Sequence, residues 1–244
     1  MNRSAQVLAT KLRTLSSLSA GDLELIDRVI PPASHYEARR DLIREGEVPQ
    51  YVMLVVQGFA CRYKTLRDGK RHLVALLLPG DCGDLHAPLL DHMDHGIATH
   101  TACLIAKIPR EGVLDMLESP ALEKALRRST LVDEAILREW LLNIGQRRSE
   151  ERLAHLLCEL HHRLRAIGMA GEAGYDLPLT QAELGEIAGL STVHVNRVVK
   201  ELRRRELVYL RRGRVEIPDP RRLAWLCGFN ANYLHQLAEA GTFS

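Results

Sequence analysis

The feature that most constrains the fold is residues 180–205, which read TQAELGEIAGLSTVHVNRVVKELRRR. Thr180 followed three residues later by Glu183 is the capping-box spacing that begins a helix. Gly185 and Gly189 supply what a tight crossing of two helices needs, namely a small residue where the backbones meet and a turn glycine between the helices. The stretch therefore predicts a helix-turn-helix.

The second of these two helices divides into an apolar and a polar face. Ser191 is placed to cap it, and burial of Val195, Val198, Val199 and Leu202 turns the other side outward. Asn pairs bidentately with adenine and Arg with guanine, so Asn196 and Arg197 suit base edges. The residues expected to face outward are Thr192, Val193, Asn196, Arg197, Lys200 and Arg203, with the triplet 203–205 placed for phosphates. The alternative is that these residues form only a solvated basic surface, but the predicted crossing of two helices favours contact with DNA.

The residues after this helix predict a wing. Two short strand-like runs, Leu207–Leu210 and Val215–Ile217, are separated by the basic glycine turn 211–214. We expect its arginines, Arg212 among them, to lie against the DNA backbone. The net charge of +2 conceals a local excess, because 191–222 hold 10 basic against 4 acidic residues. A basic concentration of this kind indicates a polyanionic partner.

The first half of the chain predicts a β structure behind a short helix at Leu18–Ile30 that Ser19 caps. From 34 to 109, strand-like runs alternate with glycine turns, and Asp68-Gly69 between two of them is a strong hairpin signal. Several short antiparallel strands within so few residues predict a small barrel or roll. The fold class is thus α+β, with a β roll, a long helix and a winged helix-turn-helix.

Helical periodicity over 119–144 places apolar residues on two stripes. We expect one stripe to cover the barrel and the other, Val132, Ile136 and Trp140, to pair with a second copy of the chain. The alternative is that both stripes are buried within one subunit. After a hinge at Gly145-Gln146 a further helix runs to Ile167. The predicted domains are a sensor domain at 1–118, a dimerisation helix and hinge at 119–146, and a DNA-binding domain with a C-terminal extension at 147–244.

This order of elements, together with LTQAELGEIAGLSTVHVNRVVKELRRRELV and a wing, resembles the Crp/Fnr superfamily of bacterial transcription regulators over about residues 15–218. The resemblance implies a cyclic-nucleotide-binding-like jelly roll, a helical dimer interface and RNA polymerase as a partner. Val193 stands where the family commonly has a glutamate, so the half-site preference cannot be copied. The implied DNA contacts are Thr180, Gln181 and Ser191 for phosphates, joined by Lys200, Arg203 and Arg212, and Thr192, Val193, Asn196 and Arg197 for bases.

The stretch that matches the family's cyclic-nucleotide site has lost the phosphate-binding pair. Asp94 and His95 stand near the positions of its arginine and serine, and 80–104 contain neither Arg nor Lys. A carboxylate repels a phosphodiester, so we expect no binding of cyclic AMP in the usual mode. The predicted effector pocket, with an unknown effector, comprises Gly83, Asp84, Leu85, His86, Asp94 and His95.

Other chemistries find little support in the sequence. The histidines at 86, 92, 95 and 100 match no metal-ligand spacing, and no cysteine precedes Cys61, so we expect no metal, haem or iron-sulfur cluster. The five scattered cysteines predict no disulfide framework, although single-thiol redox sensing by Cys61, Cys82 or Cys103 stays open. The chain has no GxSxG, Walker or HExxH motif, which argues against an enzyme.

The longest apolar run, Leu73–Leu78, is far too short to span a membrane, so we expect a soluble, cytoplasmic protein. The competing function is a small-molecule, metal, haem or redox sensor whose helix-turn-helix serves mainly protein contact. Salt-sensitive, sequence-specific binding to duplex DNA separates this alternative from a transcription regulator.

Overall fold

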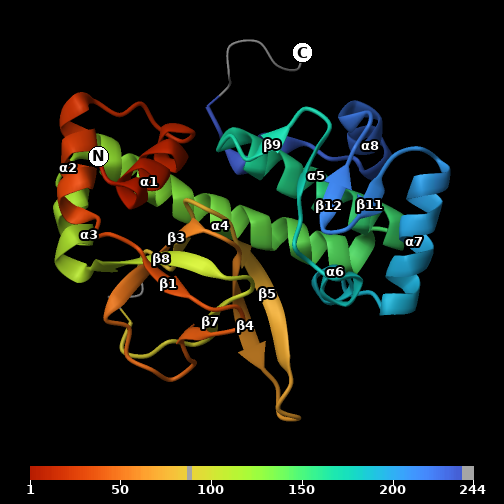
Figure 1. Cartoon of the computed structure of the whole chain (residues 1–244), viewed down its shortest axis with the longest axis horizontal. Helices are drawn as coiled ribbons and strands as arrows, with labels where there is room; N and C mark the ends of the chain where they lie inside the picture. Colours follow the sequence, from red (N-terminus) through yellow and green to blue (C-terminus); the bar gives the residue numbers. More distant parts are fainter. Residues whose placement is uncertain (87–89, 238–244) are drawn as a thin grey trace. The chain divides into compact units, whose positions relative to one another are not determined.

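The computed structural model describes residues 1–86 and 90–237 and divides into two compact units. Among the described residues, the N-terminal unit comprises Met1–Val132 with residues 235–237, and the C-terminal unit comprises Asp133–Leu234 (Figure 1). Among the described residues, no helix combines the length and the apolar character needed to cross a membrane.

The N-terminal unit is an antiparallel roll of two four-stranded sheets, in the orders β1-β8-β3-β6 and β2-β7-β4-β5. The predicted jelly roll is thereby confirmed. Its strands are β1 Ser34–Tyr36, β2 Asp41–Ile43, β3 Tyr51–Gln57, β4 Ala60–Thr65, β5 Arg71–Leu77, β6 Cys82–Gly83, β7 Gly96–Thr99 and β8 Cys103–Pro109.

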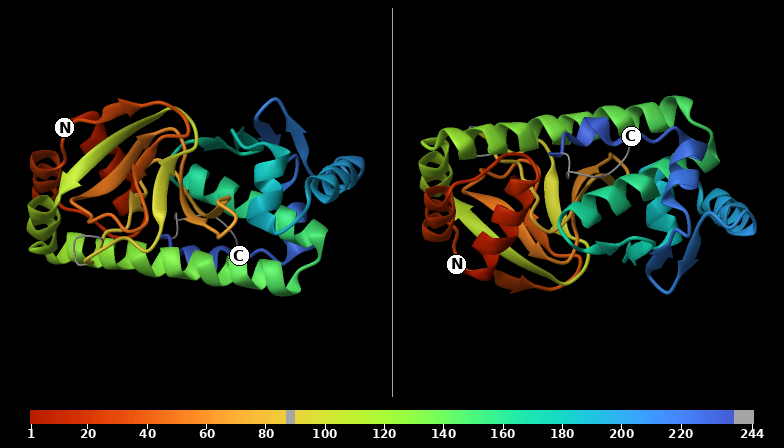
Figure 2. Two further views of the ribbon diagram at one scale, coloured as in Figure 1. Left: turned by 90° about the horizontal axis from the view of Figure 1, so that it is seen from below. Right: turned by 90° about the horizontal axis from the view of Figure 1, so that it is seen from above.

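Strand β3 is buried on both faces, which explains its unbroken apolar sequence. Val52 and Leu54 pack with helices, whereas Met53 and Val55 belong to the core between the two sheets. Alternate side chains of a strand point to opposite faces, so a strand covered on both sides needs apolar residues throughout. Figure 2 shows the helices that lie beside the roll.

The predicted hairpin at Asp68-Gly69 joins β4 to β5, with Thr65 opposite Arg71. Gly69 alone takes a positive φ, +78°, while its N–H donates to the carbonyl of Leu66. The glycine thus provides the left-handed residue that lets the chain reverse with a bulge.

Helices α1 (Arg3–Arg13), α2 (Ala20–Val29) and α3 (Arg110–Leu117) complete this unit, and the long α4 (Pro120–Gln146) starts in it. Ser19 caps α2 through a capping box with Asp22, as expected. The sequence analysis missed α1. Its buried face, which includes Ala5, Leu8, Ala9 and Leu12, has helical spacing, but two of these side chains are alanines and give a weak apolar signal.

The C-terminal unit packs helices on a four-stranded sheet in the order β11-β12-β10-β9. The predicted wing is strands β11 and β12, and its turn at Arg212 (φ +50°) and Gly213 (φ +76°) has the two positive φ angles of a tight hairpin turn. The sequence analysis missed β9 and β10, which extend the wing. The remaining elements are α5 Ser149–Ala166, β9 Ala170–Gly171, β10 Gly174–Asp176, α6 Gln181–Ala188, α7 Thr192–Arg204, β11 Tyr209–Arg211, β12 Arg214–Glu216, α8 Pro220–Cys227 and the 3-10 helix η2 Ala231–Leu234.

The predicted crossing of two helices is that of α6 and α7. Gly189 ends α6 in the left-handed conformation (φ +62°), and Ser191 caps α7. A Cβ atom on Gly185 would lie 2.5 Å from the carbonyl oxygen of Leu190 and 3.2 Å from Cγ2 of Val195. Only glycine therefore allows this approach without a shift of the backbone.

We predict that Gly185→Ala lowers the free energy of unfolding by about 1–3 kcal/mol, because the added methyl overpacks the crossing. Gly145→Ala is the matched control. It places the same methyl inside α4 with nothing within 4 Å, and should stabilise by up to ~1 kcal/mol. Urea unfolding of the full chain measures both changes. Equal stability of Gly185→Ala and the wild type would contradict the tight crossing.

Candidate nucleic-acid interface

Helix α7 presents the side chains that the sequence predicted to face outward. Val195, Val198 and Leu202 are buried, whereas Val199 is half-buried. Val193 is 80% exposed, an unusual state for a valine. The exposed face carries Thr192, Val193, Asn196, Arg197, Lys200 and Arg203.

The basic residues of this unit fall into a free and a paired group. Within the described chain, neither an ion pair nor a hydrogen bond engages the side chains of Arg197, Lys200, Arg203 and Arg212. Arg204 and Arg205 instead pair with Glu201 and Glu150. The triplet 203–205 therefore offers one uncommitted cation, Arg203, and the other two stabilise the helix ends.

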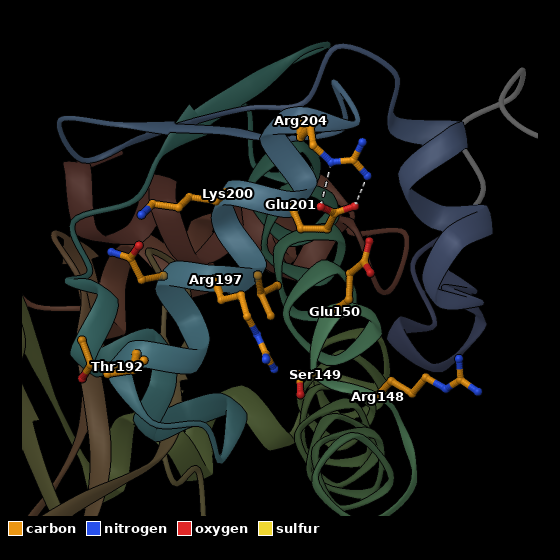
Figure 3. Close-up of a pocket in the computed structure, with 11 residues that line it drawn as sticks. Arg148, Ser149, Glu150, Thr192, Arg197, Lys200, Glu201 and Arg204 are labelled. Atoms are coloured by element: carbon orange, nitrogen blue, oxygen red, sulfur yellow. Dashed lines mark hydrogen bonds and ion pairs between the residues drawn. The ribbon is translucent and has the colours of Figure 1, made fainter.

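A concave surface of about 900 Å³ lies between α7 and the start of α5. Four cationic and two anionic side chains line it, so its net charge is positive. Figure 3 shows Arg197 pointing from α7 toward Ser149, while Lys200 points away from that side. These two cations thus extend in different directions from one helix. The charged lining comprises Arg148, Glu150, Arg197, Lys200, Glu201 and Arg204.

The three residues that the sequence assigned to phosphates from the helix starts already have partners. Thr180 donates to the Glu183 carboxylate at 2.7 Å and accepts from the backbone N–H of Glu183. Ser191 accepts from the backbone N–H of His194 at 3.3 Å. The hydroxyls of both residues thus serve first as helix caps.

Gln181 contacts the exposed face of α7 directly. Its Oε1 accepts a hydrogen bond from Nδ2 of Asn196 at 3.1 Å. An Nδ2 group has two protons, so Asn196 keeps one donor and its Oδ1 acceptor for another partner. Gln181 therefore holds the amide of Asn196 in one orientation.

The three residues predicted for the dimer seam on α4 are buried in the single chain. Val132, Ile136 and Trp140 are at most 7% exposed in the single chain. Trp140 faces inward, and its Nε1 donates to the buried carboxylate of Glu159 at 3.2 Å. The large apolar side chains that α4 does expose are Leu131, Leu137, Leu141, Leu142 and Ile144. Periodicity located two apolar stripes but not which one faces the core.

The predicted effector pocket forms an ionic cluster at the end of the roll. His95 Nε2 lies 2.7 Å from one oxygen of Asp84, and His95 Nδ1 lies 2.7 Å from Asp94. Arg62, from β4, places Nε 3.0 Å from the second oxygen of Asp84. Arg62 was not predicted as a pocket residue, because it lies outside 80–104, the stretch that matches the family's nucleotide site. Its signal was a cation between two buried residues of strand β4, Cys61 and Tyr63.

The other predicted pocket residues lie apart from this ionic cluster. Leu85 is buried in the helix-facing core, and His86 Nε2 lies 3.2 Å from Oγ1 of Thr130 on α4. Both line a small hollow of about 200 Å³ beside α3 and α4. Gly83 stays next to the ionic cluster, at the end of β6.

The charged groups of the ionic cluster stabilise one another's charged forms. The hydrogen bond to Asp84 raises the pKa of His95, and this effect outweighs the burial of the imidazole. Burial opposes ionisation of Asp84, but the hydrogen bond from His95 and the charge of Arg62 hold its pKa below the ordinary value. Two carboxylates therefore neutralise the cations that a phosphodiester would need.

Comparison with known proteins identifies the domain family that each unit matches. The profile of the cyclic nucleotide-binding domain matches residues 33–119, and that of the Crp-like helix-turn-helix domain matches residues 151–226. The transcriptional activator protein FnrL of Cereibacter sphaeroides is 31% identical over 179 residues, which are 72% of this chain and 71% of FnrL. The chain belongs to the Crp/Fnr family. It is a DNA-binding transcription regulator.

Other members of the Crp/Fnr family agree. The nitrogen fixation regulation protein FixK of Bradyrhizobium diazoefficiens is 24% identical over 209 residues, covering 85% of this chain and 86% of FixK. The solved structure of FixK2 from Bradyrhizobium japonicum superposes with a TM-score of 0.69 at 22% identity, over 81% of this chain and 97% of that one. The superposition on FixK2 supports the fold. A helix-turn-helix used mainly for protein contact is not favoured.

We predict that His95→Gln destabilises the N-terminal unit in a pH-dependent way. The folded pKa of His95 lies above its ordinary 6.5, so its stabilisation is fully present below about pH 6.5 and is lost as the pH rises through the folded pKa. The melting temperature of the variant should therefore fall well below that of the wild type at about pH 6, and the gap should narrow toward about pH 9.

His35→Gln, in the exposed strand β1, controls for the loss of an imidazole. A gap that grows with pH would show that His95 acts as a neutral ring and that the ionic cluster is wrongly described.

Proposed function

We propose that this Crp/Fnr regulator binds an inverted-repeat operator as a homodimer, with one α7 helix in the major groove of each half-site. The observation that carries the proposal is the exposed face of α7, where free cations flank an apolar side chain and an oriented amide. Phosphate contacts supply most of the affinity, and base edges supply the sequence preference. The sensor domain (1–118), dimerisation helix (119–146) and DNA-binding domain (147–244) then have distinct roles.

Base reading falls to the N-terminal turns of α7. Arg197 has no competing partner among the described residues and suits guanine O6 and N7. Asn196, held by Gln181, retains one donor and one acceptor, which is the pair that adenine N7 and N6 require. Gln181 thus acts as a positioning residue in addition to any phosphate contact through its own Nε2.

Val193 changes the expected preference at one position. It has no acceptor for a cytosine amino proton, and its methyl groups lie in water in the free protein. Apolar contact with the C5-methyl of thymine buries those groups. The half-site should therefore contain a thymine where relatives with a glutamate read cytosine, while Thr192 adds a hydroxyl beside it.

The exposed leucines of α4 support a dimer through a face other than the one first predicted. Leu131, Leu137, Leu141, Leu142 and Ile144 lie on one helix and are at least 43% exposed. A second copy that packs along α4 buries them and places two α7 helices for two half-sites. Leu131 and Leu142 belong to the stripe that the sequence assigned to the barrel.

The ionic cluster at Asp84 argues against cyclic AMP as the effector. Arg62 is the guanidinium that contacts Asp84 in the predicted pocket, and the carboxylate of Asp84 already engages it. Any effector that binds there must compete with that carboxylate. The relatives' names as transcriptional activators further suggest RNA polymerase as the partner at the promoter, in the cytoplasm, and a regulatory rather than an enzymatic role.

We predict that Arg197→Ala and Arg212→Ala weaken DNA binding in different ways. Arg197→Ala should cost about 1–3 kcal/mol on the cognate duplex and relax the preference at one base pair. Arg212→Ala, at the tip of the wing, should weaken cognate and scrambled duplexes alike and reduce the salt slope by about one per half-site.

Binding titrations at several salt concentrations distinguish the two effects. Arg67→Ala removes an exposed arginine from the hairpin of the roll and is the matched control. Equal losses for Arg197→Ala on cognate and scrambled DNA would mean that Arg197 contacts only the backbone.

We also predict that Leu141→Glu converts the dimer to a monomer and lowers DNA affinity with it. Leu141 is 74% exposed in the single chain, so the substitution leaves the fold intact while a charge enters the proposed interface. Sedimentation analysis measures the oligomeric state. Leu66→Glu, at a leucine 56% exposed in the roll hairpin, controls for the added charge. A Leu141→Glu protein that stays dimeric at wild-type concentrations would place the interface elsewhere.

A further inference from the structure

Two cysteines that are distant in sequence lie next to each other in the C-terminal unit. Cys158 lies in the middle of α5, and Cys227 is the last residue of α8, which packs on α5 (Figure 1). Each of the two thiols shifts the pKa of the other, which places the Cys158 and Cys227 side chains next to each other. Cys227 in turn donates to the carbonyl of Leu223 at 3.3 Å. Both residues are buried and reduced.

Independent contacts fix the segment after Cys227 on the same face of α5. The ring of Phe229 lies 5.2 Å from that of His155 and 6.2 Å from that of His162. These histidines stand three residues before and four residues after Cys158, which is the spacing of one helix face. Tyr233 then donates to the carboxylate of Glu159 at 3.0 Å. Cys158 and Cys227 therefore face each other for reasons unrelated to their sulfur chemistry.

We propose that Cys158 and Cys227 form a reversible intramolecular disulfide when the protein meets a hydroperoxide. The bond would close a loop over 159–226, which contains α6, α7 and the wing. The whole DNA-binding motif thereby lies inside one covalent ring. This inference does not depend on the base contacts proposed above.

The chemistry assigns a different role to each thiol. Hydrogen bonds from the Cys158 thiol and from the backbone N–H of Phe229 lower the pKa of Cys227, and they outweigh its burial. The hydrogen bond to Cys227 and burial raise the pKa of Cys158. Cys227 ends the short helix α8, whereas Cys158 lies inside α5. Because the thiolate is the nucleophile, Cys227, on the segment that opens more easily, reacts first and Cys158 resolves the product.

The steps balance as follows. The Cys227 thiolate attacks one oxygen of hydrogen peroxide and breaks the O–O bond, which leaves a sulfenic acid and a hydroxide that takes up the thiol proton as water. The Cys158 sulfur then attacks the sulfenic sulfur. The S–S bond forms, the S–O bond breaks, and the second oxygen leaves as water with the Cys158 proton. Two electrons pass from the two thiols to one peroxide.

Access to the buried pair requires the C-terminal segment to open. Helix α8 has only eight residues and ends at Gly228 in the left-handed conformation. Short terminal elements of this kind open locally with less free energy than the core around α5. The oxidant thus reaches the thiols without unfolding of the DNA-binding motif.

The test treats the full-length wild-type protein with hydrogen peroxide, blocks the remaining thiols, and maps linked peptides by mass spectrometry. We expect a Cys158–Cys227 peptide that dithiothreitol removes. We also expect the thermal transition of the C-terminal unit to rise by roughly 10 °C on oxidation, because the cross-link restricts the unfolded chain. Cys158→Ala should abolish both the linked peptide and the thermal shift.

The cysteines of the roll are the internal comparison. Cys103 donates to the carbonyl of Phe59 at 3.2 Å, and its thiol should stay available for blocking after denaturation. A Cys103→Ala protein should retain the Cys158–Cys227 link and the thermal shift. The proposal is overturned if both thiols of the pair remain free, if either ends as an unlinked sulfinic acid, or if the link joins another cysteine or another chain.

Discussion

The approach of α6 to α7 at Gly185 determines what this regulator can present to DNA. With hydrogen as its side chain, Gly185 allows the carbonyl of Leu190 to lie where a Cβ would otherwise clash. The turn at Gly189 then closes, Ser191 caps α7, and the buried side of α7 is fixed by Val195, Val198 and Leu202. Because a helix has two faces, fixing the buried face also fixes which residues point outward. The pairing of Gln181 with Asn196 depends on the same crossing, since it joins the start of α6 to the exposed side of α7.

The helix-turn-helix packs on α5, whose buried centre contains the carboxyl group of Glu159. Glu159 is completely buried and is approached by Trp140 from α4, Arg163 from α5 and Tyr233 from η2. Burial raises the pKa of Glu159, while Arg163 and the hydrogen bonds oppose that rise. A buried carboxyl group without partners is destabilising, so each of these three contacts contributes to the stability of the unit. The C-terminal segment is therefore part of the fold of the DNA-binding unit.

Sequence patterns predicted the structure best at positions where a local requirement of the backbone allows few residue types. The capping box at Thr180, the glycines of the crossing and the wing turn led to the helix-turn-helix with its outward face, because each is a local requirement of the backbone. Patterns predicted poorly where the answer depends on the rest of the fold. Two apolar stripes on α4 were visible, but only the packing of Trp140 on Glu159 shows which stripe is internal.

The ionic cluster and the thiol pair fall into this second class. The side chain of Arg62 reaches from β4 in one sheet to Asp84 and the carbonyl of Cys82 at β6 in the other sheet, which is a matter of sheet topology rather than of sequence spacing. Cys158 and Cys227 meet because α8 folds back on α5. The short strands β9 and β10 were missed for a related reason, because the hydrogen bonds of β10 to the wing and of β9 to β10, rather than their own composition, make them strands.

The central claim is that α7 reads base sequence as one of a symmetric pair. Selection of duplexes bound by the full-length protein from a random pool tests this claim most directly, because it assumes no operator in advance. The account predicts enrichment of an inverted repeat whose half-sites are about one helical turn apart and contain a guanine for Arg197. A selected pool with no common motif, or with a motif that lacks two-fold symmetry, would contradict it.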